Sequence, residues 1–333
     1  MTMNQASIAS FEIAKGERTV LLLSEAEVEQ HLDLGQLLDG LEEGFRQLEH
    51  GAVQSPPRPE ITIPSAGFSL AMAAWMPGLQ ICVKVVNVFE ANLDILLPNH
   101  LAMITLYDPN TGATSCVMDG TYITAVRTAA SAVLSVRLLS RTDSRVATIV
   151  GAGVQAREHL RLLPMVRDFE RINICSFEYE HACRLAERSE LSQPCADMRA
   201  AVAESDVVCL ATHSPRPVIN AEWVRPGTHV CSVGYYPPDG ELPRALTHRS
   251  HLVVESLDAF EPAPVGCADL SEVDPSHATT LGAVALDPAR GRTSPEQITL
   301  YKAMGLAMED LVAANLAYTS AVASVPPSQA MTW

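Results

Sequence analysis

The stretch TIVGAGVQAREHL, residues 148–160, predicts a strand, a glycine turn and the start of a helix. Gly151 permits a tight turn, Gly153 lets a phosphate approach the backbone, and Ala156 allows the helix to pack closely on the strand. The backbone N–H groups of Val154 and Gln155 and the positive end of the helix dipole attract a pyrophosphate. The stretch therefore predicts a dinucleotide-binding turn. The alternative is an ordinary glycine pair between a strand and a helix.

Short apolar runs alternate with helical runs on the C-terminal side of this turn. RINIC, DVVCLAT, GTHVCSVG and HLVVES are typical of buried strands, and EHACRLAERS is typical of a helix. Such alternation predicts a parallel sheet with helical crossovers. The fold class that follows is α/β, with a Rossmann-type parallel-sheet domain.

The residues after the second strand bear on the choice of cofactor. A carboxylate usually follows this strand and binds the ribose hydroxyls. Here the customary position is Ser176, and Glu178 stands two residues further on, with no arginine beside it to bind a 2′-phosphate. We expect NAD, with Glu178 as a possible ribose ligand, while NADP stays open.

The first half of the chain predicts a smaller α+β region. Ser24 and Glu27 have the spacing of a helix capping box, and LGQLLDGLEEGFRQLEHG predicts a helix that ends at Gly51. GFSLAMAAWMP and QICVKVVNVFE predict strands joined at Pro77-Gly78, and LAMITLYDPNTGATSCVMDG predicts a hairpin. TYITAVRTAASAVLSVRLLS predicts a long helix. TLYKAMGLAMEDLVAANLAYTSAVAS predicts a last helix that is long enough to return to the first half.

Composition excludes several classes of partner. The 333 residues suffice for two domains, and a net charge of −16 argues against nucleic acid. No apolar run has the roughly 18 residues of a membrane span, and the N-terminal residues lack the pattern of a secretory signal, so we expect a cytoplasmic protein. The eight cysteines have no metal-ligand spacing, so we expect buried free thiols and no metal site.

Three cations interrupt apolar or stiff segments. Lys84 lies in the apolar run CVKVVN, Arg127 lies in TAVRTAAS, and Arg58 stands between prolines in PPRPE. Lys84 taken alone is also compatible with a lysine at a strand edge that extends its charge to water. Together the three predict an anionic substrate, a carboxylate, beside a nicotinamide.

The order of these motifs resembles the ornithine cyclodeaminase/mu-crystallin family. The resemblance rests on Pro57-Arg58, Met76-Pro77, Val83-Lys84-Val85, LYDPNTG, MDGTYITAVRTAAS, GAGVQA and TLYKAMGLAMEDLVAA, from about Leu21 to Ala321. It implies a homodimer of two-domain subunits. Residues 1–138 and 304–333 would form a substrate-binding and dimerisation domain, and residues 139–303 the dinucleotide-binding domain.

The resemblance also implies roles for individual residues. Arg58 and Lys84 would bind the substrate carboxylate, with Lys84 near the reacting carbon. Arg127 would serve substrate and cofactor, and Thr128 would lie beside the phosphates. Residues 212–219 would line the nicotinamide side, and the segment 232–234 would follow into the active site. Thr212, Val233 and Gly234 are therefore expected at the cofactor.

The chain departs from the cyclodeaminases after Gly234. In those enzymes an aspartate soon after the matching glycine handles the substrate amine. Here Tyr236 takes its place, and Asp239 follows three residues later in a proline-glycine loop. Either Asp239 swings in as a catalytic group or the amine-handling step is absent. Asp239 is also compatible with an ordinary turn residue before glycine.

The retained cations and the missing aspartate favour one reaction. We expect an NAD(P)H-dependent reductase of a 2-imino acid, a cyclic ketimine such as Δ1-pyrroline-2-carboxylate. The alternatives are an ornithine or lysine cyclodeaminase that recycles NAD, an alanine- or opine-type dehydrogenase, and a non-catalytic ligand-binding protein.

Overall fold

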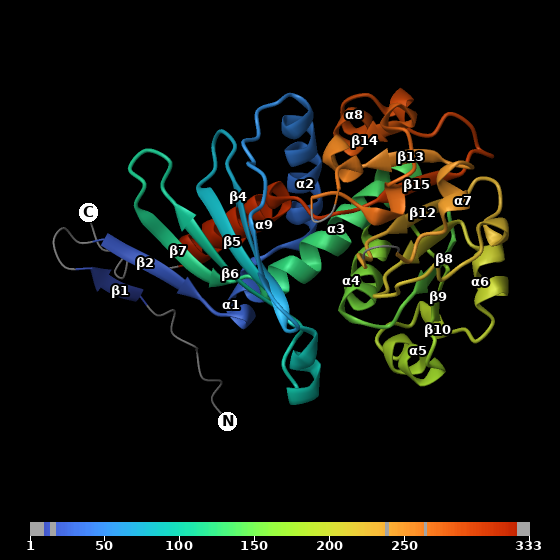
Figure 1. Ribbon diagram of the computed structural model, residues 1–333, viewed down its shortest axis with the longest axis horizontal. Coiled ribbons are helices and arrows are strands. Elements are labelled where there is room, and N and C mark those ends of the chain that lie inside the picture. The colour runs from blue at the N-terminus through green and yellow to red at the C-terminus, as the bar shows by residue number, and fades with distance from the viewer. Residues whose placement is uncertain (1–9, 14–17, 237–239, 263–264, 325–333) are drawn as a thin grey trace. The chain divides into compact units, whose positions relative to one another are not determined.

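A computed structural model describes residues 10–13, 18–236, 240–262 and 265–324 (Figure 1). The chain divides into two compact units. Unit 1 takes in the residues up to Gly40, Gly51–Thr124 and the residues from Ala307 on, and unit 2 takes in Leu41–His50 and Ala125–Leu306. The sequence-based boundary at residue 138 lies at the C-terminal end of helix α3 (Thr121–Leu139), whereas the observed boundary lies near its N-terminal end, between Thr124 and Ala125.

Unit 1 is built on a seven-stranded sheet in the order β1-β2-β7-β6-β5-β4-β3. Neighbouring strands are antiparallel except for the parallel pair β2 and β7. The strands are β1 (Ser10–Ile13), β2 (Arg18–Leu23), β3 (Glu60–Ile63), β4 (Gly67–Ala74), β5 (Ile81–Val88), β6 (His100–Tyr107) and β7 (Thr114–Asp119).

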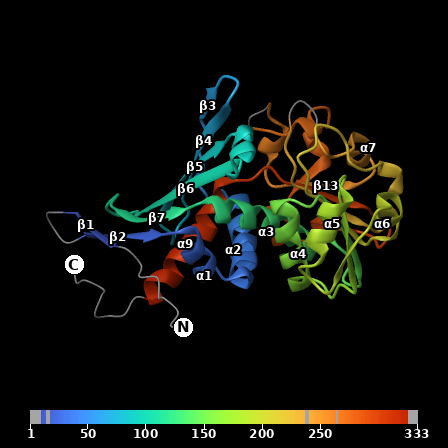
Figure 2. The same cartoon turned by 90° about the horizontal axis from the view of Figure 1, so that it is seen from below.

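Helices α1 (Glu25–His31) and α9 (Ala307–Ser324) lie on one face of this sheet, as Figure 2 shows. Burial alternates along β5, where Cys82, Lys84 and Val86 are buried and Val85 is exposed. This alternation follows from the two-residue period of a strand, which points successive side chains to opposite faces. Lys84 therefore lies on the helix-covered face.

Local signals in this half confirm the predicted elements. Ser24 and Glu27 form the capping box of α1. The helix α2 (Leu34–Glu49) ends just before Gly51, which has φ +70°. Strands β4 and β5 pair across a turn in which Gly78 has φ +89°, and β6 and β7 form the expected hairpin. A short 3₁₀ helix, η1 (Glu90–Ile95), precedes β6.

Unit 2 contains an eight-stranded sheet whose neighbouring strands are all parallel, in the order β10-β9-β8-β11-β12-β15-β13-β14. The first five positions follow the Rossmann order, so the predicted fold class is confirmed. The strands are β8 (Val146–Val150), β9 (Arg171–Cys175), β10 (Ser192–Pro194), β11 (Val207–Leu210), β12 (His229–Ser232), β13 (His251–Val254), β14 (Ala278–Thr280) and β15 (Thr299–Lys302).

Helical segments connect these strands. The α-helices are α4 (Val154–Leu162), α5 (Tyr179–Ala186), α6 (Met198–Glu204), α7 (Arg244–Thr247) and α8 (Leu281–Leu286). The 3₁₀ helices are η2 (Leu163–Met165), η3 (Ala221–Trp223), η4 (Leu257–Phe260), η5 (Ala268–Leu270), η6 (Pro275–His277) and η7 (Pro288–Arg290).

The prediction that the last helix begins at TLYK was wrong. Thr299–Lys302 forms strand β15, which is inserted between β12 and β13, and all four of its residues are buried. The helix begins only at Ala307. Neighbouring strands bury all four residues, so β15 lacks the alternation of buried and exposed residues that marks a half-buried strand.

Helix α3 is long and apolar enough by composition to cross a membrane. However, 78% of its most apolar window is buried inside the protein. Burial of this kind is typical of a core helix, which is hydrophobic all round because protein surrounds it.

Candidate functional site

The glycine turn after β8 has a backbone that only glycine adopts easily. Gly151 has φ +124°, and a Cβ there would lie 2.2 Å from the carbonyl oxygen of Ala211. Its N–H donates to the carbonyl of Cys175 at 2.8 Å. The turn is thereby fixed between the ends of β9 and β11, at the carboxyl edge of the sheet. This is the edge at which dinucleotides bind in doubly wound folds.

The N-terminus of α4 is open. Gly153 is its N-cap and contributes no side-chain hydrogen bond, and a Cβ at this position would meet no atom within 4 Å beyond its chain neighbours. Val154 is exposed, whereas Ala156 is fully buried. The first N–H groups of a helix lack partners within the helix, so this end suits a pyrophosphate. The residues present fit a dinucleotide.

A second contact fixes the start of α4 against α3 within unit 2. The side-chain Nε2 of Gln155 donates to the carbonyl of Ala125 at 3.3 Å. Arg127 and Thr128 follow on α3, Arg127 almost fully buried and Thr128 half-buried. The cofactor turn and these two predicted residues therefore belong to neighbouring segments of one unit.

Arg127 packs against the loop that follows β15. Gly305 has φ +79°, and a Cβ there would lie 2.5 Å from Nη1 of Arg127. The buried carboxylate of Glu255 accepts hydrogen bonds from the N–H groups of Met304 and Gly305 at 2.8 and 2.7 Å. Glu255 thus fixes the loop on which the guanidinium lies.

Glu241 is a buried acid at this edge of the sheet that the sequence analysis missed. Its side chain is completely buried, and one oxygen accepts from the N–H and the hydroxyl of Thr212 at 2.7 and 2.6 Å. The other oxygen accepts from the hydroxyl of Ser232 at 2.9 Å and from the N–H of Gly234 at 2.7 Å. This one carboxylate joins the ends of β11 and β12.

The same carboxylate explains the glycine at 234. A Cβ there would lie 2.5 Å from Cδ of Glu241 and 2.5 Å from the carbonyl oxygen of Thr212. Val233, half-buried beside it, donates its N–H to the carbonyl of Leu210 at 3.2 Å. The predicted cofactor residues Thr212, Val233 and Gly234 therefore come together at the carboxyl edge.

Lys302 completes this buried polar cluster. Its ammonium donates to the carbonyl of Gly234 and to the hydroxyl of Ser232, and it forms an ion pair with Asp269 at 3.0 Å. Burial alone would lower the pKa of Lys302, but the nearby Cys267, Asp269 and Glu241 outweigh it and the pKa is raised. Lys302 is therefore a charged structural group.

In the loop after Gly234, the structure describes Tyr235 and Tyr236 and then resumes at Gly240. Tyr236 is partly exposed and makes an edge-to-face contact with His213, with ring centroids 4.7 Å apart. Asp239, predicted as a possible catalytic group, lies outside the described residues. The acid of the described part of the loop is Glu241, which faces inward.

Glu178 follows β9, the strand next to β8. It is the N-cap of α5, its side chain is 66% exposed, and its carboxylate lies 3.1 Å from Nε2 of His181. Glu178 therefore lies after β9 with its side chain exposed, and its role as a ribose ligand stays a prediction.

In unit 1, Lys84 forms a buried ion pair. Its Nζ lies 2.6 Å from Oδ2 of Asp310 on α9, and both side chains are 1% exposed. Burial and the negative charge of Asp310 raise the pKa of the neighbouring Cys82 thiol, and the Lys84 charge opposes this rise. Arg58 is half-buried in the segment before β3. The alternative interpretation of Lys84, as a lysine at a strand edge that extends its charge to water, is therefore excluded.

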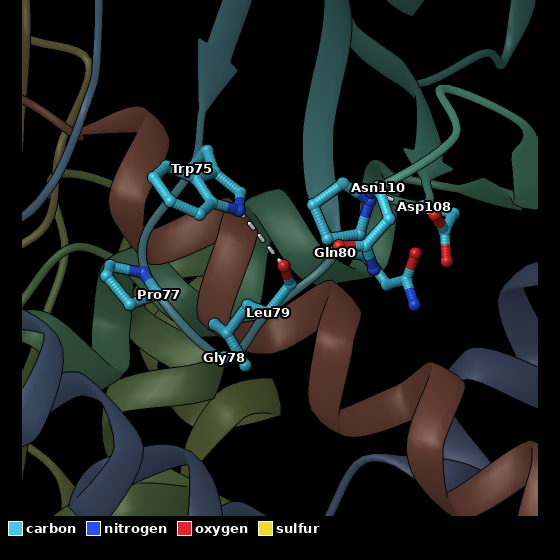
Figure 3. Close-up of a pocket in the computed structure, with 8 residues that line it drawn as sticks. Trp75, Pro77, Gly78, Leu79, Gln80, Asp108 and Asn110 are labelled. Carbon is cyan, nitrogen blue, oxygen red and sulfur yellow. Dashed lines mark hydrogen bonds between the residues drawn. The ribbon is translucent and has the colours of Figure 1, made fainter.

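Unit 1 also has an open hollow of about 470 Å³ at its strand turns, shown in Figure 3. Trp75, Pro77 and Leu79 line one side, and Asp108 and Asn110 line the other. The indole Nε1 of Trp75 donates to the carbonyl of Leu79 at 3.2 Å. None of the predicted site residues that the structure describes lines this hollow, so we do not take it as the candidate active site.

A family model describes nearly the whole chain. The ornithine cyclodeaminase/mu-crystallin family model matches residues 18–324. The chain belongs to this family. The glycine turn, the buried lysine of β5 and the loop after β12 described above all lie within the matched range.

Relatives of the chain in this family carry several functions. The ketimine reductase mu-crystallin of Mus musculus is 31% identical over 312 residues, which cover 91% of this chain and 98% of the relative. A Δ1-pyrroline-2-carboxylate reductase of Thermococcus litoralis, solved with NADH and L-proline, has a TM-score of 0.84 at 34% identity and covers 91% of this chain and 98% of that chain. An archaeal alanine dehydrogenase dimer with bound NAD has a TM-score of 0.85 at 30% identity and covers 91% and 96%.

Proposed function

We propose that this member of the ornithine cyclodeaminase/mu-crystallin family is an NADH-dependent reductase of 2-imino acids. The substrate class is a cyclic ketimine such as Δ1-pyrroline-2-carboxylate, whose reduction gives a cyclic amino acid. The similarity to a ketimine reductase and to a pyrroline-carboxylate reductase, each covering 91% of this chain, supports the proposal.

The observation that carries the proposal is the orientation of Glu241. A cyclodeaminase needs an acid in this loop to handle the substrate amine. Four hydrogen bonds from Thr212, Ser232 and Gly234 occupy both oxygens of Glu241. Residues 234–236 and 240–242 contain no other acid. The described part of the loop therefore favours reduction over deamination, and Asp239 is left as the one acid that would support a cyclodeaminase.

The cofactor would lie on the turn of unit 2. Gly151, Gly153 and the N–H groups of Val154 and Gln155 would hold its pyrophosphate, with Ala156 permitting close helix packing and Thr128 beside the phosphates. Glu178 would accept hydrogen bonds from the ribose hydroxyls, which favours NAD over NADP. Thr212, Val233 and Gly234 would border the nicotinamide. The bound cofactor supplies a hydride to the C=N carbon.

The substrate would be held by its carboxylate. Arg58 and Arg127 would bind it, because guanidinium groups match carboxylate geometry. Lys84 would lie near the reacting carbon, and its ammonium would donate a proton toward the imine nitrogen as the carbon is reduced. Asp310 would hold this ammonium in place through the 2.6 Å ion pair.

An alanine-type amino-acid dehydrogenase is the second candidate. The archaeal alanine dehydrogenase has a TM-score of 0.85 and covers 91% of this chain, which favours it. Such an enzyme would form its imine from a 2-oxo acid and ammonia, and the same cations would hold the carboxylate. The two candidates differ in whether ammonia is a substrate.

A substrate screen tests the proposal. Purified enzyme is mixed with NADH or NADPH and with a cyclic ketimine, with pyruvate plus ammonia, or with ornithine, while absorbance and released ammonia are measured. We expect NADH oxidation with the cyclic ketimine. Release of ammonia from ornithine without net change in NADH, together with no ketimine reduction, would refute the proposal. Oxidation only with pyruvate plus ammonia would favour the dehydrogenase.

We also propose that the protein is a cytoplasmic homodimer in which unit 1 is the substrate-binding and dimerisation domain and unit 2 the cofactor-binding domain. Val85 and Met103, partners in register on β5 and β6, are 40% and 51% exposed on the sheet face opposite α9. An exposed apolar sheet face suits a second copy of the chain. All eight cysteines are free, as in a reducing compartment. Light scattering coupled to gel filtration should give twice the chain mass of 35.9 kDa.

A further inference from the structure

A buried cluster in unit 2 combines one histidine and two cysteines. His159 on α4, Cys209 on β11 and Cys231 on β12 have ligand atoms that all lie within 4.8 Å of one another. All three side chains are completely buried. Cys209 and Cys231 are register partners on neighbouring parallel strands, and the helix that begins at the glycine turn brings His159 to them.

The histidine is oriented as a metal ligand is. Its Nδ1 donates to the carbonyl of Gln155 at 2.8 Å, which leaves Nε2 with its lone pair toward the cluster. This buried Nε2 has no nitrogen or oxygen partner among the described residues, and the Cys231 thiol is the group that faces it. Metal-bound histidines usually donate their other N–H to a carbonyl, which fixes the tautomer and the ring.

We propose that His159, Cys209 and Cys231 bind one thiophilic metal ion, Zn²⁺ or Cu⁺. Two sulfurs and an imidazole nitrogen are the donors that these ions prefer. On binding, each thiol loses one proton to solvent and neutral His159 binds through Nε2, so two protons are released. Two thiolates neutralise Zn²⁺ completely and leave one negative charge around Cu⁺, which favours Zn²⁺ in a buried site.

The position of the cluster gives the ion a structural effect. It would join strands β11 and β12 to α4, the helix that begins at the turn proposed to hold the pyrophosphate. Because an ion that binds only the folded state stabilises it, loading should raise the melting temperature. This proposal does not depend on the reaction that the enzyme catalyses, and its test measures no activity.

The experiment is a metal analysis of the full chain, purified under reducing conditions without a polyhistidine tag. Protein stripped by a chelator is incubated with Zn²⁺ or, separately, with Cu⁺, desalted, and analysed by mass spectrometry for metal. We expect about one ion per chain for the ion that the site prefers. Co²⁺ in place of Zn²⁺ should give a thiolate charge-transfer absorption.

Cysteine variants test whether the ion binds at this cluster. Cys209→Ala and Cys231→Ala should each lose the bound ion, whereas Cys116→Ala should keep it, because Cys116 is equally buried but lies in β7 of unit 1. Retention of less than about 0.1 ion per chain by folded wild-type protein would overturn the proposal and leave a thiol core. Equal binding by wild type and both cluster variants would overturn it too. The wild-type measurement decides even if a variant fails to fold.

Discussion

Each unit of this protein contains a completely buried lysine paired with an aspartate. In unit 1, Lys84 lies 2.6 Å from Asp310, and in unit 2, Lys302 lies 3.0 Å from Asp269. Both lysines interrupt apolar runs and look alike in the sequence. Lys302 also donates hydrogen bonds to Ser232 and Gly234, so it fixes the carboxyl end of β12 and the start of the loop that follows. We propose that Lys84 instead directs its charge at the substrate.

The comparison teaches that a buried charge does not by itself mark a catalytic group. A structural lysine has its donors directed at fixed acceptors of the protein. A catalytic lysine must also reach the reacting atoms. The two lysines therefore offer a matched pair for experiments.

The largest effect should separate Lys84→Met from Lys302→Met. Each change leaves a buried aspartate without its partner, so each should cost about 3–5 kcal/mol of stability. In folded protein, Lys84→Met should lower kcat by about 10²–10⁴-fold with little change in NADH affinity, because it would remove the proposed proton donor. Lys302→Met should mainly weaken NADH binding. Chemical denaturation, steady-state kinetics and NADH titration measure these effects, and the reverse pattern would contradict the assigned roles.

The glycine turn of unit 2 offers a second pair. Gly151→Ala places a Cβ 2.2 Å from the Ala211 carbonyl, so it should disrupt the fold. Gly153→Ala meets no atom within 4 Å, so the free protein should keep its melting temperature. If a pyrophosphate lies against Gly153, the methyl group should still weaken NADH binding at least tenfold, a loss of about 1.4 kcal/mol. Unchanged NADH affinity in Gly153→Ala would refute the cofactor site.

Glu241→Gln tests the loop that Lys302 supports. The change removes charge-assisted hydrogen bonds to Thr212 and Gly234, each worth about 1.5–3 kcal/mol. We expect NADH to bind about 10–100-fold more weakly, with kcat at saturating NADH changed less. Glu222→Gln, at an exposed position in η3, is the matched control and should bind NADH normally. A pure loss of kcat in Glu241→Gln would instead make this acid a catalytic residue.

The smallest effect concerns a buried histidine in the same sheet. His229 contacts Ser135 at 3.0 Å and Thr299 at 2.9 Å, and burial, followed by the charges of Arg292 and Arg167, holds its pKa well below 6.5. The unfolded chain binds a proton below about pH 6.5 that the folded protein excludes, so stability falls as the pH drops through this value.

Wild type should therefore lose about 1.4 kcal/mol more than His229→Gln between about pH 8 and about pH 5.5. Urea denaturation at the two pH values measures the difference. An equal loss in both proteins would show that His229 does not carry this dependence.

Local signals predicted much of the fold. The Ser24 capping box, the Gly78 turn and the Gly151 turn each depend on a few neighbouring residues, and the structure contains all three. Strand β15 was mistaken for helix because its burial comes from distant strands. Glu241 and the cluster at His159 escaped prediction for the same reason. The hydrogen-bond partners of Glu241 and the two cysteines near His159 lie between 7 and 72 positions away along the chain, and these spacings match no sequence motif.

Hydride transfer to the imine carbon tests the central claim most directly. Enzyme is supplied with NADH that carries deuterium at both C4 positions and with Δ1-pyrroline-2-carboxylate, and the product is analysed by mass spectrometry. We predict proline with one deuterium at its α-carbon. Proline without deuterium, or no proline while ornithine yields ammonia, would contradict the account.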